Sequence, residues 1–121
     1  ELNFEPGIYS ARYAGSNATD KENRDKLIKK LNDLSVSSLD AYYVCCLVGV
    51  KHHDDPMPLI SFGTIHGKVS TTSLGSGGFG YDKIFYLDEF KCSMAEMDPK
   101  LKNTISHRAE AVRDFIKKFE Y

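Results

Sequence analysis

The feature that most constrains the fold is a pair of apolar segments, residues 41–50 and 59–69. The first, AYYVCCLVGV, is a continuous apolar run rich in tyrosine and valine, which predicts a central strand buried on both faces. The second, LISFGTIHGKV, predicts another strand, bent at Gly63 or Gly67 because glycine weakens a strand interior. Residues 51–58 (KHHDDPMP) are polar and carry proline, so we expect a loop that joins the two strands into a hairpin.

Helical patterns lie on both sides of these strands in the sequence. Residues 17–34 predict a helix, because Thr19 and Glu22 have the spacing of a capping box. Asp98–Pro99 predicts one further helical turn, and Ser106 predicts the cap of a final helix. The first and last helices each carry one apolar face: Leu27, Ile28, Leu31 and Leu34, and Val112, Phe115, Ile116 and Phe119.

Helices mixed with strands that are far apart in the sequence favour an α/β layered fold, with a mixed sheet flanked by helices. Residues 8–13 predict a short extended segment, and residues 83–87 predict a third strand. Three strands make a thin sheet for two amphipathic helices, so we expect further strands upstream. The length of 121 residues fits a single domain, residues 1–121. Because the chain opens on Glu1 and not on methionine, we also expect a fragment or a processed chain.

Composition argues against several classes of function. A net charge of -1 gives no electrostatic basis for non-specific binding to nucleic acid. No apolar run approaches the roughly 20 residues needed to cross a bilayer. We therefore expect neither a nucleic-acid partner nor a membrane partner. The three cysteines are odd in number and lack the spacing of a disulfide framework, which suggests a reducing compartment, and we expect a cytoplasmic location.

Residues 73–81 (SLGSGGFGY) are rich in glycine, and Gly75–Gly80 matches the pattern GxGxxG. No helical pattern follows at once, so we reject a dinucleotide site. A plain glycine-rich turn remains an alternative. However, Phe79, Tyr81 and Asp82 place two aromatic rings and a carboxylate on a backbone that a flat ring can approach closely. An aromatic face beside hydrogen-bonding groups suits a nucleobase.

A second polar group lies where the final helix begins, in KNTISHR (residues 102–108), which contains Lys102, His107 and Arg108. A helix start has unpaired N–H groups and a positive dipole, so an anionic or carbonyl-rich ligand would explain cations there. A capped helix with solvated basic residues remains the alternative. Residues 52–55 (HHDD) favour a solvated loop over a metal site, because adjacent histidines seldom chelate one ion.

Three segments together resemble the inosine triphosphate pyrophosphatase family, which hydrolyses non-standard purine nucleoside triphosphates. They are PGIYSARYAG (residues 6–15), GSGGFGYDKIF (residues 75–85) and KNTISHR (residues 102–108), and AEM (residues 95–97) fits as well. The resemblance covers nearly the whole chain in order. One departure is Lys83, where the family usually has proline, and we expect this change to be tolerated locally.

The resemblance implies that this chain is the C-terminal two-thirds of the family fold and lacks its N-terminal strands. It implies a homodimer and the Mg²⁺-dependent hydrolysis of ITP, dITP or XTP to the monophosphate and pyrophosphate. It also implies no catalytic and no metal-binding residue in this chain, because the family's phosphate loop and carboxylates lie upstream. The substrate-binding residues carried over are Phe79, Gly80, Tyr81, Asp82, Lys102, His107 and Arg108.

The chemistry of the bases supports this transfer. Hypoxanthine and xanthine carry a carbonyl where adenine carries an amino group, and Lys102 and Arg108 have only donors to offer. Phe79 can stack on the ring, and Asp82 can accept a ring N–H or orient the basic residues. Two alternatives remain open: a truncated nucleotide-binding module that hydrolyses nothing, and a fragment kept only as part of a dimer interface.

Overall fold

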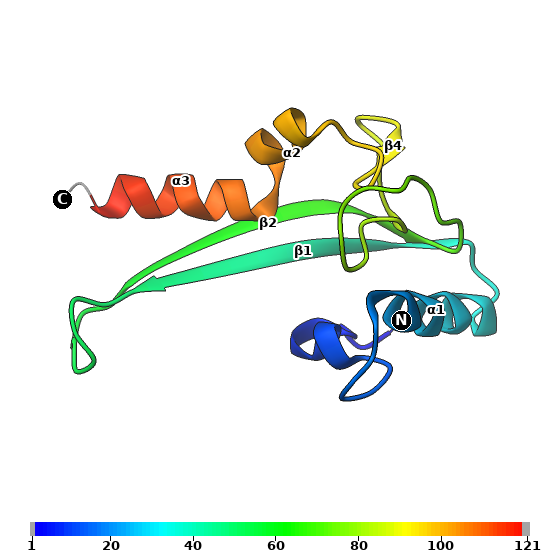
Figure 1. Cartoon of the computed structure of the whole chain (residues 1–121), viewed down its shortest axis with the longest axis horizontal. Coiled ribbons are helices and arrows are strands. Elements are labelled where there is room, and N and C mark those ends of the chain that lie inside the picture. The colour runs from blue at the N-terminus through cyan, green and yellow to red at the C-terminus, as the bar shows by residue number, and fades with distance from the viewer. Residues whose placement is uncertain (1, 120–121) are drawn as a thin grey trace. The chain divides into compact units, whose positions relative to one another are not determined.

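A computed structural model describes residues 2–119 (Figure 1). Its elements are η1 (Gly7–Arg12), α1 (Asp20–Asp33), β1 (Ser38–Gly49), β2 (Leu59–Ser70), β3 (Phe85–Leu87), β4 (Cys92–Ser93), α2 (Pro99–Ile105) and α3 (His107–Phe119). The strands form one sheet of four in the order β1-β2-β3-β4, so the predicted α/β fold with helices flanking a sheet is confirmed. Within residues 2–119, no helix combines the length and the apolar character that crossing a membrane requires.

The chain divides into two compact units, each of which has its own packing. Unit 1 comprises the residues up to Ala41 together with Gly67–Met97, and unit 2 comprises Tyr42–His66 together with the residues from Asp98 on. The long strands β1 and β2 each contribute one segment to each unit. The assignment of residues 1–121 to a single domain stays a prediction.

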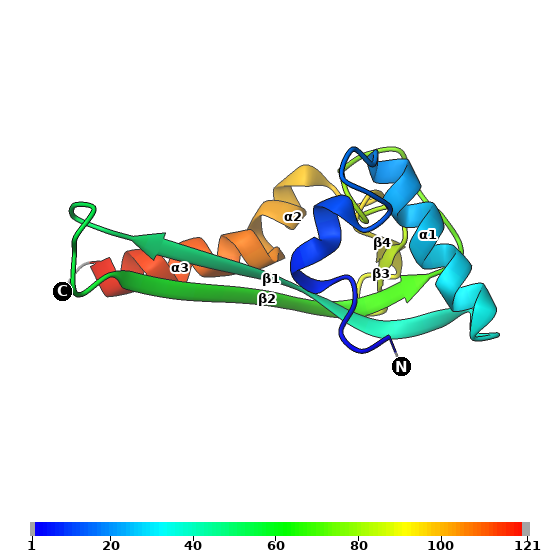
Figure 2. The same cartoon turned by 90° about the horizontal axis from the view of Figure 1, so that it is seen from below.

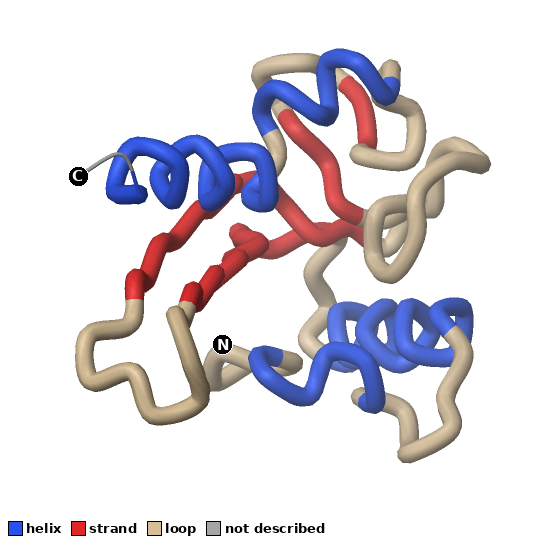
Figure 3. Tube along the Cα trace, turned by 60° about the vertical axis from the view of Figure 1, so that its left-hand side comes forward, coloured by secondary structure: helices blue, strands red, loops and turns tan. Residues whose placement is uncertain are grey.

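Helix α1 supplies much of the core of unit 1. It begins where the capping box predicts, since Thr19 Oγ1 accepts the Glu22 N–H (3.1 Å) and Glu22 Oε1 accepts the Thr19 N–H (3.0 Å). Next to it lies η1 (Figure 3), joined through Asn23, which donates to the Ala11 carbonyl (3.0 Å) and accepts the Ala14 N–H (2.8 Å). One cluster of buried residues in this unit comprises Tyr13, Leu27, Leu31, Val69 and Ile84.

The extended conformation predicted for residues 8–13 is wrong, because residues 8–12 lie in the 3-10 helix η1 and Tyr13 caps it. The Tyr9 N–H donates to the Pro6 carbonyl at 3.0 Å, which closes a turn where a strand would need a partner. The side-chain amide of Asn23, a buried residue, then donates a hydrogen bond to the carbonyl of Ala11. A segment of six residues is too short for its apolar pattern to separate these two conformations.

The short strands of unit 1 pair in antiparallel fashion, with Val69 opposite Phe85 and Tyr86 opposite Ser93. Gly67 permits this pairing, since a Cβ there would lie 2.6 Å from the Tyr86 carbonyl oxygen. The glycine in the strand is therefore explained by a close approach of backbones. Strand β4 was not predicted, because its two residues carry no periodic signal.

In unit 2, β1 and β2 are neighbours that run in opposite directions (Figure 2), which confirms the predicted hairpin. Helix α3 lies against β2 where the strand carries small residues. The buried hydroxyl of Ser61 donates to the Ala111 carbonyl oxygen at 2.9 Å, and Gly63 faces the backbone of His107 and Ala111. Further along, Lys118 Nζ donates to the Ile60 carbonyl at 2.8 Å.

The predicted burial of β1 on both faces is wrong for the described structure. Strand β1, predicted to be central, lies at the edge of the described sheet. Its alternate side chains are exposed: Tyr42, Val44, Cys46 and Val48. On α3, Val112, Ile116 and Phe119 of the predicted stripe are exposed, whereas Ala111 is buried. A run that is apolar on both faces gives no periodic signal of which face is covered, and small residues set the contact of α3 with β2.

We predict that Gly63→Ala destabilises the protein more than Gly49→Ala. A Cβ at Gly63 would overlap backbone atoms of His107 and Ala111, whereas a Cβ at Gly49 would meet only the far end of the Phe115 ring, which can rotate aside. Overpacking typically costs about 1–3 kcal/mol, and we expect a loss of this size for Gly63→Ala alone. Chemical denaturation of the two variants measures the difference. Equal losses would show that α3 does not approach β2 this closely.

Candidate functional site

The glycine-rich segment forms a loop of unit 1 that joins β2 to β3 (Figure 3). Its ends are closed by a bond from the Leu74 N–H to the Lys83 carbonyl (2.8 Å), and the Gly77 N–H donates to the Ala95 carbonyl (3.2 Å). The bond at position 83 uses a carbonyl, which proline also has, so the departure at Lys83 leaves it intact. The loop carries the four residues predicted to contact the nucleobase, Phe79, Gly80, Tyr81 and Asp82.

Asp82 is the last of these four loop residues and is only 5% exposed. Its Oδ2 accepts the Phe79 N–H at 3.2 Å, while its own N–H donates to the Phe79 carbonyl at 3.1 Å. Gly78, at φ +70°, makes room for the carboxylate, since a Cβ there would overlap Asp82. The Ala95 N–H donates to the Asp82 carbonyl at 3.1 Å. These bonds define a tight turn that presents Phe79.

The two aromatic rings of the loop have different surroundings. Phe79 is 53% exposed, as a ring that stacks on a base must be before binding. Tyr81 instead packs against the core of unit 1, and its hydroxyl donates to the Ser10 carbonyl at 2.6 Å. Burial raises the pKa of Tyr81 to about 12, with smaller contributions from Tyr13 and Asp20. Tyr81 therefore anchors the loop to η1 through Ser10.

Gly80 is bonded on both sides by α1. Its N–H donates to Asp20 Oδ2 at 2.9 Å, and its carbonyl accepts from Arg24 Nη1 at 2.8 Å. The sequence analysis did not identify Asp20 or Arg24 as partners of this loop. Their spacing of four residues places them on one face of α1, but no local pattern connects that face with a loop 56 to 60 positions away.

Lys102, His107 and Arg108 lie in unit 2, where α2 ends and α3 begins. Ser106 connects the two helices: its N–H donates to the Lys102 carbonyl (2.9 Å), and its Oγ accepts the Ala109 N–H (3.1 Å). The predicted cap is therefore confirmed. The His107 ring lies 4.9 Å from the Tyr43 ring, centre to centre, which fixes the imidazole beside β1.

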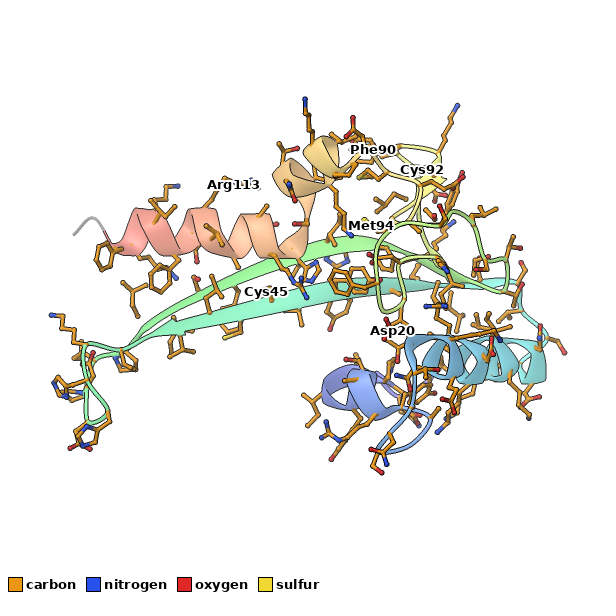
Figure 4. All side chains as sticks on the ribbon, in the orientation of Figure 1. Asp20, Cys45, Phe90, Cys92, Met94 and Arg113 are labelled. Carbon is orange, nitrogen blue, oxygen red and sulfur yellow. The ribbon has the colours of Figure 1, made fainter. Side chains whose placement is uncertain are left out.

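Arg113 joins α3 to the end of α2 (Figure 4). Its Nη1 donates to the Thr104 carbonyl at 2.8 Å, in the last turn of α2, where carbonyls lack helical partners. This bond holds the junction in place without using Lys102 or Arg108. Lys102 is half-buried and Arg108 is exposed, so the junction offers two cations of different accessibility.

Among residues 2–119, no group of three or more histidine, cysteine, aspartate or glutamate side chains could hold a metal ion. In the HHDD loop, Asp55 accepts the backbone N–H groups of Lys51 and Met57, each at 2.9 Å, and these bonds lower its pKa. His53 Nε2 lies 2.9 Å from Asp54 Oδ2 at the surface. The carboxylate of Asp55 thus closes a turn.

Comparison with known proteins places the chain in a family. Residues 1–118 match the Ham1 family. The dITP/XTP pyrophosphatase of Legionella pneumophila (strain Lens) is 50% identical over 111 residues, which are 92% of this chain and 57% of that protein. The dITP/XTP pyrophosphatase of Vibrio cholerae serotype O1 is 44% identical over 119 residues, which are 98% of this chain and 60% of that protein.

Solved structures agree with this match. A HAM1 protein from Coxiella burnetii superposes with a TM-score of 0.91 at 39% identity, covering 99% of this chain and 61% of that one. The Ham1 protein of Staphylococcus aureus gives a TM-score of 0.84 at 37% identity, covering 99% and 62%. The chain belongs to the Ham1 family, and the resemblance to non-standard purine triphosphate pyrophosphatases is confirmed. The chain spans less than two thirds of the length of these relatives.

We predict that Tyr81→Phe changes how stability depends on pH. The pKa of Tyr81 is raised from 10.0 to about 12, so its proton stabilises the folded state fully below about pH 10, and that contribution is lost as the pH rises towards 12. Tyr81→Phe should remove this part of the alkaline loss. It should also lower the free energy of unfolding at pH 7 by about 1 kcal/mol, through loss of the bond to Ser10.

The measurement is denaturation of wild type and variant from pH 8 to 12, together with the tyrosinate absorbance of the native protein. Tyr9→Phe, an exposed tyrosine of η1, is the matched control. An alkaline stability curve that is identical in wild type and Tyr81→Phe would place the hydroxyl in water.

Proposed function

We propose that the whole protein hydrolyses non-standard purine nucleoside triphosphates, ITP, dITP and XTP, to the monophosphate and pyrophosphate, and so cleanses the nucleotide pool. In this proposal the described chain supplies the recognition of the base. The observation that carries it is the loop turn in which buried Asp82 holds the backbone of Phe79 while the Phe79 ring faces solvent. The names of the relatives, dITP/XTP pyrophosphatases, support the choice of substrate class.

The residues divide the work of recognition by their chemistry. The Phe79 ring offers a face for stacking, which every base can use. Lys102 and Arg108 can donate to the purine carbonyl, and the amino group of adenine would face donors there at a cost in binding energy. His107 is held beside them by the Tyr43 ring. Gly80, Tyr81 and Asp82 shape and anchor the loop that carries Phe79.

Further parts of the proposal concern the whole protein. Mg²⁺ is its proposed cofactor, neutralising the charge of the triphosphate, with ligands outside residues 2–119. A homodimer is proposed as its assembly. The apolar side chains that unit 2 exposes on β1, β2 and α3 support it, among them Val44, Phe62 and Ile116. The proposed location is the cytoplasm, and residues 1–121 are proposed to act as one domain.

A second candidate is a nucleotide-binding module without hydrolysis. It is favoured by the position of the loop carboxylate, since Asp82 is buried and directed to the backbone of its own loop. Release of pyrophosphate from ITP, with ATP as comparison and Mg²⁺ present, separates the two. Turnover supports the enzyme, and saturable binding of ITP without turnover supports the module.

We predict that Phe79→Ala in the complete protein weakens the binding of inosine nucleotides by about 1–3 kcal/mol, the usual range for a base on an aromatic face. KM for ITP should rise more than kcat falls, because stacking is felt in the ground state and the transition state alike. Phe4→Ala is the control, since Phe4 is an exposed ring that belongs neither to the loop nor to the proposed dimer surface. An unchanged KM in Phe79→Ala would remove Phe79 from the pocket.

We predict that Lys102→Met and Arg108→Met narrow the preference for ITP over ATP. A buried donor left facing another donor costs roughly 1–3 kcal/mol, so removing the donor should relieve the penalty that ATP suffers. The measurement is kcat/KM for both substrates in the complete protein. Lys100→Met, an exposed lysine of α2, is the control. A fall by the same factor for both substrates would assign these cations to the phosphates or to the fold.

A further inference from the structure

Two side chains of α1 hold both polar groups of one loop residue. Asp20 Oδ2 accepts the Gly80 N–H at 2.9 Å, and Arg24 Nη1 donates to the Gly80 carbonyl at 2.8 Å. The N–H belongs to the peptide that follows Phe79, and the carbonyl belongs to the peptide that precedes Tyr81. The pair therefore fixes the two peptide planes on either side of Gly80.

The cap of α1 does not use the side chains of Asp20 and Arg24. The first turn of α1 is already capped by the reciprocal bonds of Thr19 and Glu22. Two other pairs at the same spacing bond within the helix, namely Lys21 with Asp25 (2.7 Å) and Lys29 with Asp33 (3.0 Å). The side chains of Asp20 (Figure 4) and Arg24 instead bond to Gly80 of the loop.

The loop has a particular need for such bonds. Gly80 has φ +58°, and a Cβ there would meet nothing within 4 Å, so packing does not hold this residue. Without a side chain, glycine moves readily among many backbone conformations. Each change of φ or ψ at Gly80 would turn the Phe79 ring relative to the anchored ring of Tyr81. Hydrogen bonds to the backbone of Gly80 are the direct means of preventing this.

We propose that Asp20 and Arg24 are positioning residues for base recognition, because they hold Gly80 and so orient the ring of Phe79 for stacking on the purine. This rests on the proposed function of the loop. The two residues touch neither the base nor the phosphates in this proposal. The carboxylate of Asp20 accepts from Gly80 and the guanidinium of Arg24 donates to it. Hydrogen bonds to charged groups are stronger than those between neutral groups.

The test compares Asp20→Ala and Arg24→Met with Asp25→Ala and Lys21→Met in the complete protein. The second pair removes the same charges from the same helix without touching the loop. We expect KM for ITP to rise about threefold to tenfold in the first pair, with kcat nearly unchanged, because a mobile ring reduces the binding-competent fraction. Asp20→Asn keeps an acceptor oxygen and should restore most of the affinity.

Two further readouts make the outcome decisive. The Gly80 amide proton, followed by NMR, should move upfield and exchange faster with solvent in Asp20→Ala, and should be unchanged in Asp25→Ala. If Phe79→Ala raises KM but Asp20→Ala and Arg24→Met behave like their controls, the positioning role is overturned while the proposed function stands. If Phe79→Ala itself leaves KM unchanged, the loop does not read the base, and the positioning role is overturned together with that proposal.

Discussion

The buried carboxylate of Asp82 is the interaction on which the loop of unit 1 depends. A carboxylate out of water must be hydrogen-bonded, and Asp82 bonds to the backbone of its own turn through the Phe79 N–H. Gly78 leaves the space that this bond needs, and the carbonyl of Asp82 is held from the side by Ala95. The backbone that carries the half-exposed ring of Phe79 is thus held by a buried polar contact.

Unit 2 positions its polar residues by a different device. Helix α3 packs on β2 through Ser61 and Gly63, so the backbone of His107 directly contacts the strand at Gly63. The hydroxyl of Ser61 and the side chain of Arg113 then fix the helix through backbone carbonyls. The position of the α2–α3 junction therefore depends on small residues. Adding a single methyl group at Gly63 would displace the start of α3.

Much of the local structure could be predicted from the sequence, because it is set by contacts within a few residues. The capping box at Thr19, the cap at Ser106 and the hairpin of residues 41–69 are of this kind. The edge position of β1 and the exposure of the α3 stripe could not be predicted, since they depend on which apolar face finds a partner. The role of the seven site residues in binding stays a prediction.

The candidate site residues could be chosen from the sequence, but the contacts that surround each of them could not be predicted. Phe79 and Tyr81 look equivalent in the sequence, but Tyr81 packs against the core of unit 1 and donates to Ser10, 71 positions away. The bonds from Asp20 and Arg24 to Gly80 have the same origin. Each of these contacts joins segments that no periodicity relates, so they become visible only when the fold brings the segments together.

Two of the three left-handed glycines of the loop, Gly78 and Gly80, differ in which substitutions they can accept. At Gly80, with φ +58° and open space beside it, asparagine is an available replacement, because it tolerates this conformation and leaves the backbone bonds to α1 in place. At Gly78 any Cβ would collide with the carboxylate of Asp82, so no other amino acid fits while that aspartate remains. Substitution at position 78 therefore requires a substitution at position 82 as well, whereas position 80 can be substituted alone.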